Sequence, residues 1–557
     1  MILQKNFWNF FRLVLNNFQQ VVDSGFYFEK NVLYLCTKKP KTLKIMEEIL
    51  MQLSKMQIFN QFWLSIFLLV PLVLIARTVV AGTKYSPILL VVVFGLAMGY
   101  ILVSGNVSVP GLPDFQMINI LSRATIIPLV ASFFVGGQEL RKVFSKIKIN
   151  SDDFVVPSDD EVCVGTNRTQ FVYIARTFFL LVGIEAAYKI IVGIEDGGLM
   201  KYYPLYAYIG LVCAVILIDY KAKFKDKKLY IRKGIVEMGI IILVLTLSFH
   251  LAAWIKPIIG LPQIFFAMLM TCALGAVFYK WNFGPTIKSL LFAGLPVVLA
   301  GNFIVGGSRM SEAFSISGMN SVLAFGFFGQ ILWMFGGIAL LMLFAKTAHV
   351  RNLAPGLAGG LSHAGLTGAC TAGDLGKTAA ARAPIMINVP FMSHIFIFSI
   401  LAVSVKKGYL MMIPALIVFV TGIILTWWSF RTLKKAKGDD NKEIFGLMKF
   451  SLGWQLTAIF GGFLVLSIFG MSLNHAAMGV TSSLSHFGLF AATQGGMFGF
   501  EVAELLPFIF AMPFLVHPFV FFLFGKTMDR NGEMPKLPVF ILAGIGVLGV
   551  IFSLILI

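Results

Sequence analysis

Four of the seven histidines in this chain form two pairs with the same spacing. His363 and His394 are 31 residues apart, and so are His486 and His517. Imidazole titrates near neutral pH and also binds metals, so symmetric histidines can relay protons, hold a metal ion or bind an organic anion. A lone histidine in an apolar helix is more often a packing residue. The equal spacing favours a functional role, and we expect His363 and His486 to line one cavity from its two ends.

These histidines belong to an internal repeat. Residues 361–398 align without a gap to residues 484–521, and 15 of the 38 aligned positions are identical. An apolar composition would match leucines and phenylalanines by chance, but here the unusual residues match as well. The matched residues include Gly365 with Gly488, Gly373 with Gly496, Gly376 with Gly499, Pro384 with Pro507, and Pro390 with Pro513.

Each copy begins with a stretch rich in Gly, Ser and Thr and then enters an apolar segment that contains proline. Three predicted spans, 384–405, 410–430 and 450–470, separate the two copies. An odd number of spans makes the second copy enter the membrane from the opposite face, so we expect an inverted repeat. Broken backbone is tolerated inside a membrane only where it is buried in protein or lines a cavity. Two such segments entering from opposite faces are typical of secondary transporters.

The candidate binding residues are the histidines, hydroxyls, glycines and acids of these broken segments. Hydroxyl groups suit the coordination of sodium or of substrate oxygens, and they equally suit close helix packing. Asp374 is the strongest acidic candidate, because a carboxylate at membrane depth is costly unless it serves an ion or a proton. Alternatively, Asp374 and Lys377 lie in a hydrated cytoplasmic loop. The full set of candidates is Ser362, His363, Gly365, Thr367, Thr371, Asp374, Ser485, His486, Gly488, Thr493 and Glu501.

The rest of the chain must place these residues within a bilayer. Of its 557 residues, 58% are hydrophobic and only 13% are charged, which no water-soluble fold accommodates. Apolar stretches long enough to cross a membrane recur along the chain, and they must be helices because lipid satisfies no backbone polar group. We therefore expect an all-α polytopic membrane protein with about 14 transmembrane helices, inverted repeats and two broken or re-entrant segments. The expected spans are 58–81, 86–104, 115–137, 169–193, 202–220, 234–255, 261–279, 287–306, 318–346, 384–405, 410–430, 450–470, 506–525 and 537–557.

The formal net charge of +19 comes from basic residues in short loops between apolar spans. This pattern indicates membrane orientation rather than a nucleic-acid partner. The loops Lys221 to Lys233 and Arg431 to Lys449 fall on the same side, which the positive-inside rule makes cytoplasmic. Residues 1–57 would then lie outside despite their lysines. We therefore interpret them as an extension that comes from an over-long start or forms a surface helix.

A second, fainter self-similarity joins residues 126–145 to residues 295–315. Both segments end an apolar stretch on Phe-x-Val-Gly-Gly. By the predicted span count the two segments run in opposite directions, which would make a second inverted pair. The alternative is that two unrelated apolar helices happen to end on glycines.

The motif FFVGGQELR (133–141) resembles a helix end of cation/proton antiporters. The segment GGLSHAGLTGACTAG (359–373) resembles the glycine-rich hairpins of glutamate/sodium and citrate/sodium symporters. The resemblance covers roughly 60 residues and implies an inverted-repeat secondary transporter that is coupled to sodium or protons. The paired aspartates of the antiporters are absent, which argues against simple sodium/proton exchange.

These observations predict an ion-gradient-coupled secondary transporter, a symporter or antiporter, of a small solute such as an organic anion. No nucleotide-binding or nucleophile motif appears, so we expect no enzyme activity and no cofactor beyond a coupling sodium ion or proton. Residues 58–557 would form one transporter domain with repeat units 318–430 and 450–557. The protein would be multi-pass in a membrane of the bacterial inner type, with a homodimer among its expected assemblies. Two alternatives remain open: a redox protein with histidine-ligated metal or haem, and a passive channel.

Overall fold

The described part of the chain is helical throughout and contains no β-sheet. Residues 64–557 form one unit, whereas the predicted N-terminal extension lies outside the described residues except for Gln57. The computed structural model describes residues 57–80, 87–104, 121, 124–145, 167–194, 203–219, 227–259, 262–282, 284–347, 349–361, 363–371, 375–408, 412–436, 439–484, 486–494, 500–529 and 533–557.

The first half of the described chain supplies helices that surround the repeat. One of them contains a five-residue π-helical turn, η3, which runs directly into α13. The helices are α4 (Gln57–Val80), α5 (Ile88–Ser104), α7 (Ile126–Phe144), α8 (Asn167–Val192), α9 (Tyr203–Asp219), α10 (Lys227–Ile259), α11 (Gln263–Val277), α12 (Pro285–Ser289), η3 (Leu290–Gly294), α13 (Leu295–Ser308) and α14 (Met310–Ser315).

The second half contains both copies of the repeat, and the order of long and short helices is the same in each. The first copy comprises α15 (Met319–Phe344), α16 (Val350–Leu361), α17 (Ala364–Thr371), α18 (Lys377–Met392), α19 (His394–Lys407) and α20 (Met412–Ala436). The second comprises α21 (Asp440–Ile468), α22 (Leu473–Leu484), α23 (Phe487–Gln494), α24 (Phe500–Ile509), the 3₁₀ turn η5 (Met512–Val516), α25 (His517–Asp529) and α26 (Lys536–Ile555).

Helix length and hydropathy identify a multi-pass membrane protein. Eight helices of the described chain are long and apolar enough to cross a bilayer, and α18 with α19 makes a ninth span if the bent pair is counted as one. Large apolar side chains on these helices face outward, such as Trp254 at 73% exposure and Leu548 at 68%. Because water would not tolerate so much exposed apolar surface, these faces contact lipid.

Each predicted span overlaps a helix, but eight or nine of the described helices are long and apolar enough to cross a bilayer, while others, such as α5, α9 and α11, are shorter apolar helices. Two of the predicted spans also differ from their helices. The helix near predicted span 115–137 is α7, which begins only at Ile126. The span predicted over 384–405 is not continuous, because α18 and α19 meet at Ser393 with a bend of 46°. Pro390 supplies the cause of the bend, since it removes one backbone hydrogen bond and clashes with the carbonyl four residues earlier.

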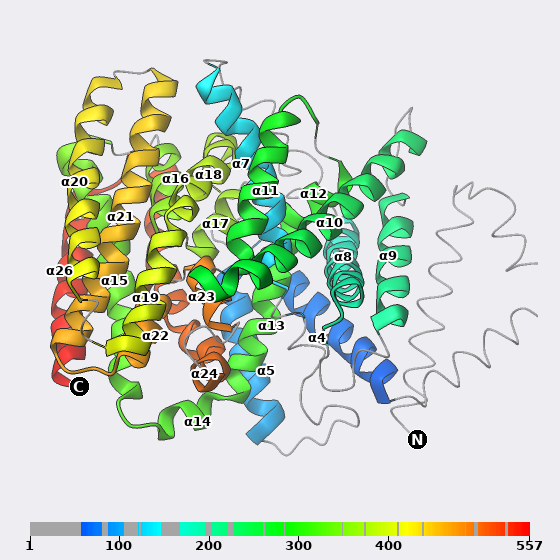
Figure 1. Cartoon of the computed structure of the whole chain (residues 1–557), viewed down its shortest axis with the longest axis horizontal. Helices are drawn as coiled ribbons and strands as arrows, with labels where there is room; N and C mark the ends of the chain where they lie inside the picture. Colours follow the sequence, from blue (N-terminus) through cyan, green and yellow to red (C-terminus); the bar gives the residue numbers. More distant parts are fainter. Residues whose placement is uncertain are drawn as a thin grey trace, which may run out of the picture. The chain divides into compact units, whose positions relative to one another are not determined.

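The two copies pack in matching ways (Figure 1). The long helix α15 lies against α26 and α22, while its counterpart α21 lies against α20 and α16. Outside the repeat, α7 packs on α11 and α18, and α13 packs on α5 and α24. The span that contains α13 is completely buried. The short helices α17 and α23, which follow the repeated histidines, pack mainly on α16 and α18 and on α24 and α11, respectively.

Candidate functional site

The candidate site lies where the two broken segments meet. The helix α16 ends at Leu361 and α17 begins at Ala364, while α22 ends at Leu484 and α23 begins at Phe487. In each gap stands the repeated histidine, and His363 pairs with His486 through an isolated antiparallel bridge. The two interruptions are therefore in contact, and their chains run in opposite directions at this point. Both histidine side chains are completely buried.

Each histidine also caps the short helix that follows it. The backbone N–H of Leu366 donates to Nδ1 of His363 at 3.0 Å, and the N–H of Leu489 donates to Nδ1 of His486 at the same distance. A ring nitrogen that accepts a hydrogen bond carries no proton, so the neutral form of both rings must be protonated at Nε2. The two copies thus present the same N–H group toward their neighbours.

Those neighbours come from the opposite copy. Nε2 of His363 lies 3.3 Å from Nε2 of His517, and Nε2 of His486 lies 3.2 Å from Nε2 of His394. Both pairs have ring centroids 4.9 Å apart. The four histidines therefore form two equivalent imidazole pairs, and each pair contains one histidine from each copy.

A glutamine joins one of the two pairs. The side-chain amide of Gln455, from the middle of α21, lies 2.6 Å from Nε2 of His486 and 3.1 Å from Nε2 of His394. The side chain of Gln455 is completely buried. The His363–His517 pair has no such amide among its described contacts, so the two pairs differ although their sequences are symmetric.

The histidine pairs explain why a glycine stands two residues after the histidine in both copies of the repeat. A Cβ atom on Gly365 would overlap Cε1 of His517, and one on Gly488 would overlap Cε1 of His394. Glycine is required at both positions because the partner ring lies directly on the backbone. Both predicted glycines therefore belong to the site, where their role is to let the partner histidine ring lie against the backbone.

Repeated phenylalanines enclose the rings. Phe391 lies 4.2 Å from the ring of His394, and its counterpart Phe514 lies 4.7 Å from the ring of His517. The fainter repeat meets the same residues, because Phe133 packs on Phe391 at 4.8 Å and Phe303 packs on Phe514 at 5.1 Å. The segments that end in Val-Gly-Gly thus occupy matching positions around the two histidine pairs.

The glycines of those segments explain how the helices come so close. A Cβ atom on Gly136 would lie 2.6 Å from the carbonyl oxygen of Pro384, and one on Gly306 would lie 2.7 Å from that of Pro507. Pro384 and Pro507 are aligned residues of the main repeat. Small residues allow helix backbones to touch inside a membrane. The matching contacts favour a true repeat over two unrelated glycine-ended helices.

The histidine pairs contact the middle of the long helix α21. Near the start of α18, Arg382 is bonded to Asp440, the first residue of α21, at 3.2 Å. Gln455 stands fifteen residues further along the same 29-residue helix, which is about 22 Å at 1.5 Å per residue.

The structure places the remaining candidates unevenly. Thr371 and Thr493 donate to backbone carbonyls of their own helices, at 2.9 Å and 2.7 Å, as packing hydroxyls do. The hydroxyl of Thr367 is buried and has no hydrogen-bond partner among the described residues. Ser362, Asp374 and Ser485 lie outside the described residues. The backbone of Glu501 lies in the first turn of α24, and its side chain is outside the described part.

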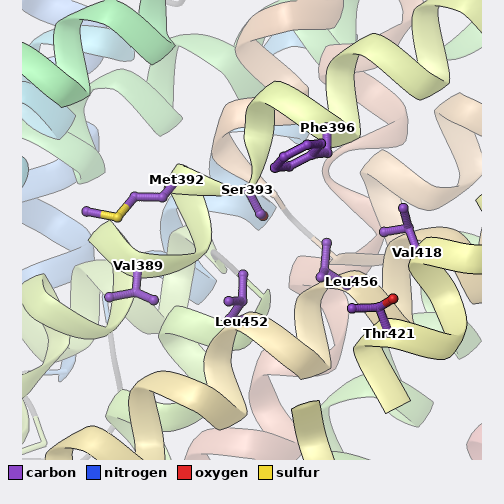
Figure 2. A pocket seen from close by; sticks show the side chains of 8 residues that line it. All are labelled: Val389, Met392, Ser393, Phe396, Val418, Thr421, Leu452 and Leu456. Atoms are coloured by element: carbon purple, nitrogen blue, oxygen red, sulfur yellow. The ribbon is translucent and has the colours of Figure 1, made fainter. Parts of the chain in front are cut away.

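The described residues do not form the cavity that we expected between His363 and His486. Both rings are fully buried and in contact with other imidazoles. A pocket of about 400 Å³ lies at the bend between α18 and α19, and two of its lining residues, Ser393 and Leu456, adjoin His394 and Gln455 in sequence. Figure 2 shows its mainly apolar lining: Val389, Met392, Ser393, Phe396, Val418, Thr421, Leu452 and Leu456.

Two acids inside other spans have structural partners. Glu185 pairs with Lys189 at 3.5 Å, and Glu237 accepts hydrogen bonds from the backbone N–H groups of Gly284, Thr286 and Ile287 at the start of α12. These contacts give both acids a stabilising role away from the histidine pairs. The described residues include no group of three or more His, Cys, Asp or Glu arranged to hold a metal ion.

Gln455 is the member of the site that the histidine repeat did not reveal. It lies outside the 38-residue alignment, and a glutamine inside an apolar helix is the signal that marks it. Comparisons with known proteins add no further guide, because no protein-family model, curated protein or solved structure matches the chain.

Proposed function

We propose that this protein is a secondary active transporter that couples the movement of a small solute to an ion gradient. The observation that carries the proposal is the meeting of two broken helices, in opposite directions, at His363 and His486. The finer architecture of this proposal has about fourteen spans. In it, α16–α17 and α22–α23 are re-entrant hairpins that enter from opposite faces.

Several contacts support this arrangement. The two hairpins begin their return helices at aligned positions, and each is capped by the same ring atom. Interrupted helices at membrane depth occur where their ends serve a substrate or ion, because the loss of backbone hydrogen bonds must be compensated. The unpartnered hydroxyl of Thr367 in α17 offers such a ligand.

The chemistry of the site favours a proton as the coupling ion. Its described polar side chains are imidazoles and an amide, and imidazole exchanges protons near neutral pH. Sodium prefers several oxygen ligands, whereas the contacts between the side chains of this site are made by nitrogen atoms. A small organic anion suits the proposal as a solute, because its charge would compensate that of a protonated ring.

The test is transport by the purified protein in liposomes that contain a pH-sensitive dye. A pH gradient or a sodium gradient is imposed, and mono- and dicarboxylates and amino acids are supplied one at a time. We expect solute uptake against its gradient, accompanied by proton entry and independent of sodium. Uptake that only equilibrates the solute would favour a channel, and absorbance of a bound haem or metal would favour a redox protein.

A labelling experiment tests the inverted orientation. Thr347 and Ser472 lie in equivalent loops, after α15 and α21 respectively. In a chain whose native cysteines are replaced by serine, Thr347→Cys and Ser472→Cys are expected to react with a membrane-impermeant maleimide from opposite faces. Reaction of both from one face would refute the inverted repeat.

A further inference from the structure

Gln455 has a counterpart in the other copy of the repeat. In α15 the sequence runs from Gln330 to Phe335-Gly336-Gly337, and in α21 it runs from Gln455 to Phe460-Gly461-Gly462. In both helices the glutamine stands five residues before the Phe-Gly-Gly motif. The spacing between these copies is 125 residues, whereas the histidine segments are 123 apart, because the loop between the long helix and the hairpin differs by two residues.

The packing agrees with this alignment. A Cβ atom on Gly329 in α15 would lie 2.8 Å from Cβ of Ser483 in α22, and one on Gly360 in α16 would lie 3.3 Å from Cα of Ser451 in α21. Each long helix thus lies against the entering helix of the opposite hairpin. Gln330 and Gln455 occupy equivalent places, each near the middle of its span.

Their bonding is nevertheless different. Gln455 contacts both rings of the His394–His486 pair. Gln330 is completely buried, and neither its amide nitrogen nor its carbonyl oxygen has a hydrogen-bond partner in the described part of the chain. A buried amide without partners raises the energy of the state that contains it. Another arrangement of the same chain, in which Gln330 found partners, would recover that energy.

We propose that Gln455 and Gln330 bind their histidine pairs alternately, one in each of two states of the protein. In the state described here Gln455 binds the His394–His486 pair, and in the alternate state Gln330 binds the His517–His363 pair while Gln455 is released. This inference rests on the proposed function, because a transporter built from inverted repeats reaches its second state when the two halves exchange conformations.

The exchange has a consequence for where a proton can bind. His486 is protonated at Nε2, so the Gln455 amide must present its carbonyl to that ring; turning an amide exchanges its two ends with little change in shape. The carbonyl then accepts from Nε2 of His394 as well. His394 keeps an unprotonated Nδ1, and no described residue bonds to that atom.

The pair without a glutamine behaves differently. His363 can donate its Nε2–H only to Nε2 of His517, which leaves His517 to carry its own proton on Nδ1. That pair has no free basic nitrogen. The rings that face His394 are those of Phe391, Phe398 and His486. The rings that face His517 are those of Phe514, Phe521 and His363. The partner histidine is the only titratable group among them, so the glutamine decides which half can accept a proton.

The experiment reads the ring tautomers by nitrogen NMR. The full-length protein, labelled with ¹⁵N in its histidine rings, is reconstituted in lipid, and single His→Gln variants assign the signals. In Gln330→Leu we expect His394 to be protonated at Nε2 and His517 at Nδ1. In Gln455→Leu we expect the reverse. Wild-type protein should show both sets, and Met334→Leu in α15 is the matched control that leaves the wild-type pattern unchanged.

Unchanged tautomers of His394 and His517 in both glutamine variants would overturn the exchange. If Gln455→Leu does not fold, Gln330→Leu alone decides, because it must remove the second set of wild-type signals. A failure of the glutamine exchange can be distinguished from a failure of the proposed transport function. Swapped tautomers without transport of any solute would refute only the transporter, and transport with unaffected tautomers would refute only the exchange.

Discussion

The contact between Gly488 and His394 offers the sharpest test of how the hairpins are held. In Gly488→Ala the added methyl group would occupy the place of Cε1 of His394, and Phe391 would lie 3.1 Å away on the same side. Both rings are buried, so the methyl group has no free space to enter. Either the ring or the start of α23 must move.

The magnitude follows from the contacts that are lost. Overpacking a buried site costs about 1–3 kcal/mol. Moving the His394 ring also breaks its 3.2 Å contact with His486 and its 3.1 Å contact with Gln455, and a buried polar group that loses its partner costs about 1–3 kcal/mol. We expect Gly488→Ala to destabilise the protein by about 2–6 kcal/mol and to abolish transport.

The assay is thermal unfolding in detergent together with uptake in liposomes. The matched control is Gly544→Ala in α26, where an added Cβ meets nothing within 4 Å. Alanine is favoured over glycine in a helix by about 1 kcal/mol, so this variant should be as stable as wild type or more so. If Gly488→Ala unfolds at the wild-type temperature and retains transport, the described contact between hairpin and ring is refuted.

Three further outcomes are expected. Glu237→Leu should lower stability by about 2–4 kcal/mol, because three backbone N–H groups at the start of α12 lose their acceptor; equal thermal unfolding of both proteins would contradict this. Arg382→Gln should weaken the attachment of α18 to Asp440 and Glu443 by about 1–3 kcal/mol, measured in the same way. His394→Gln should flatten the pH dependence of transport between about pH 5 and 8, because it removes the ring whose Nδ1 has no partner among the described residues, and an unaltered profile would reject a proton-handling role for this ring.

The sequence predicted the features of the site that depend on local composition. Glycine, proline and histidine at matched positions were enough to locate both interruptions and to single out His363, His486, Gly365 and Gly488. The apolar stretches likewise predicted a helical membrane protein. Each of these features is expressed within one segment of the chain, where spacing and hydrophobicity are direct guides to structure.

The partners of the histidines could not be predicted in the same way. The sequence groups His363 with His394 within one copy, yet His363 contacts His517 and His394 contacts His486. Such pairings depend on how two distant segments cross, which no local pattern encodes. Gln455 was missed for a related reason, since a two-residue difference in loop length places the long helices outside an ungapped alignment of the hairpins.

The choice of imidazole over carboxylate at this depth has a physical logic. Neutral histidines that contact one another bury no charge, whereas a carboxylate in the same place would carry one at considerable cost. The described contacts of the histidine layer require no ionised ring, since each joins a neutral ring to a backbone N–H, an amide or another ring. A proton added to His394 Nδ1 therefore creates a charge that this layer does not balance. An anionic solute bound beside it would supply the balance. Burying either charge alone would cost more free energy than burying both together. This difference would couple the movement of the proton to that of the anion.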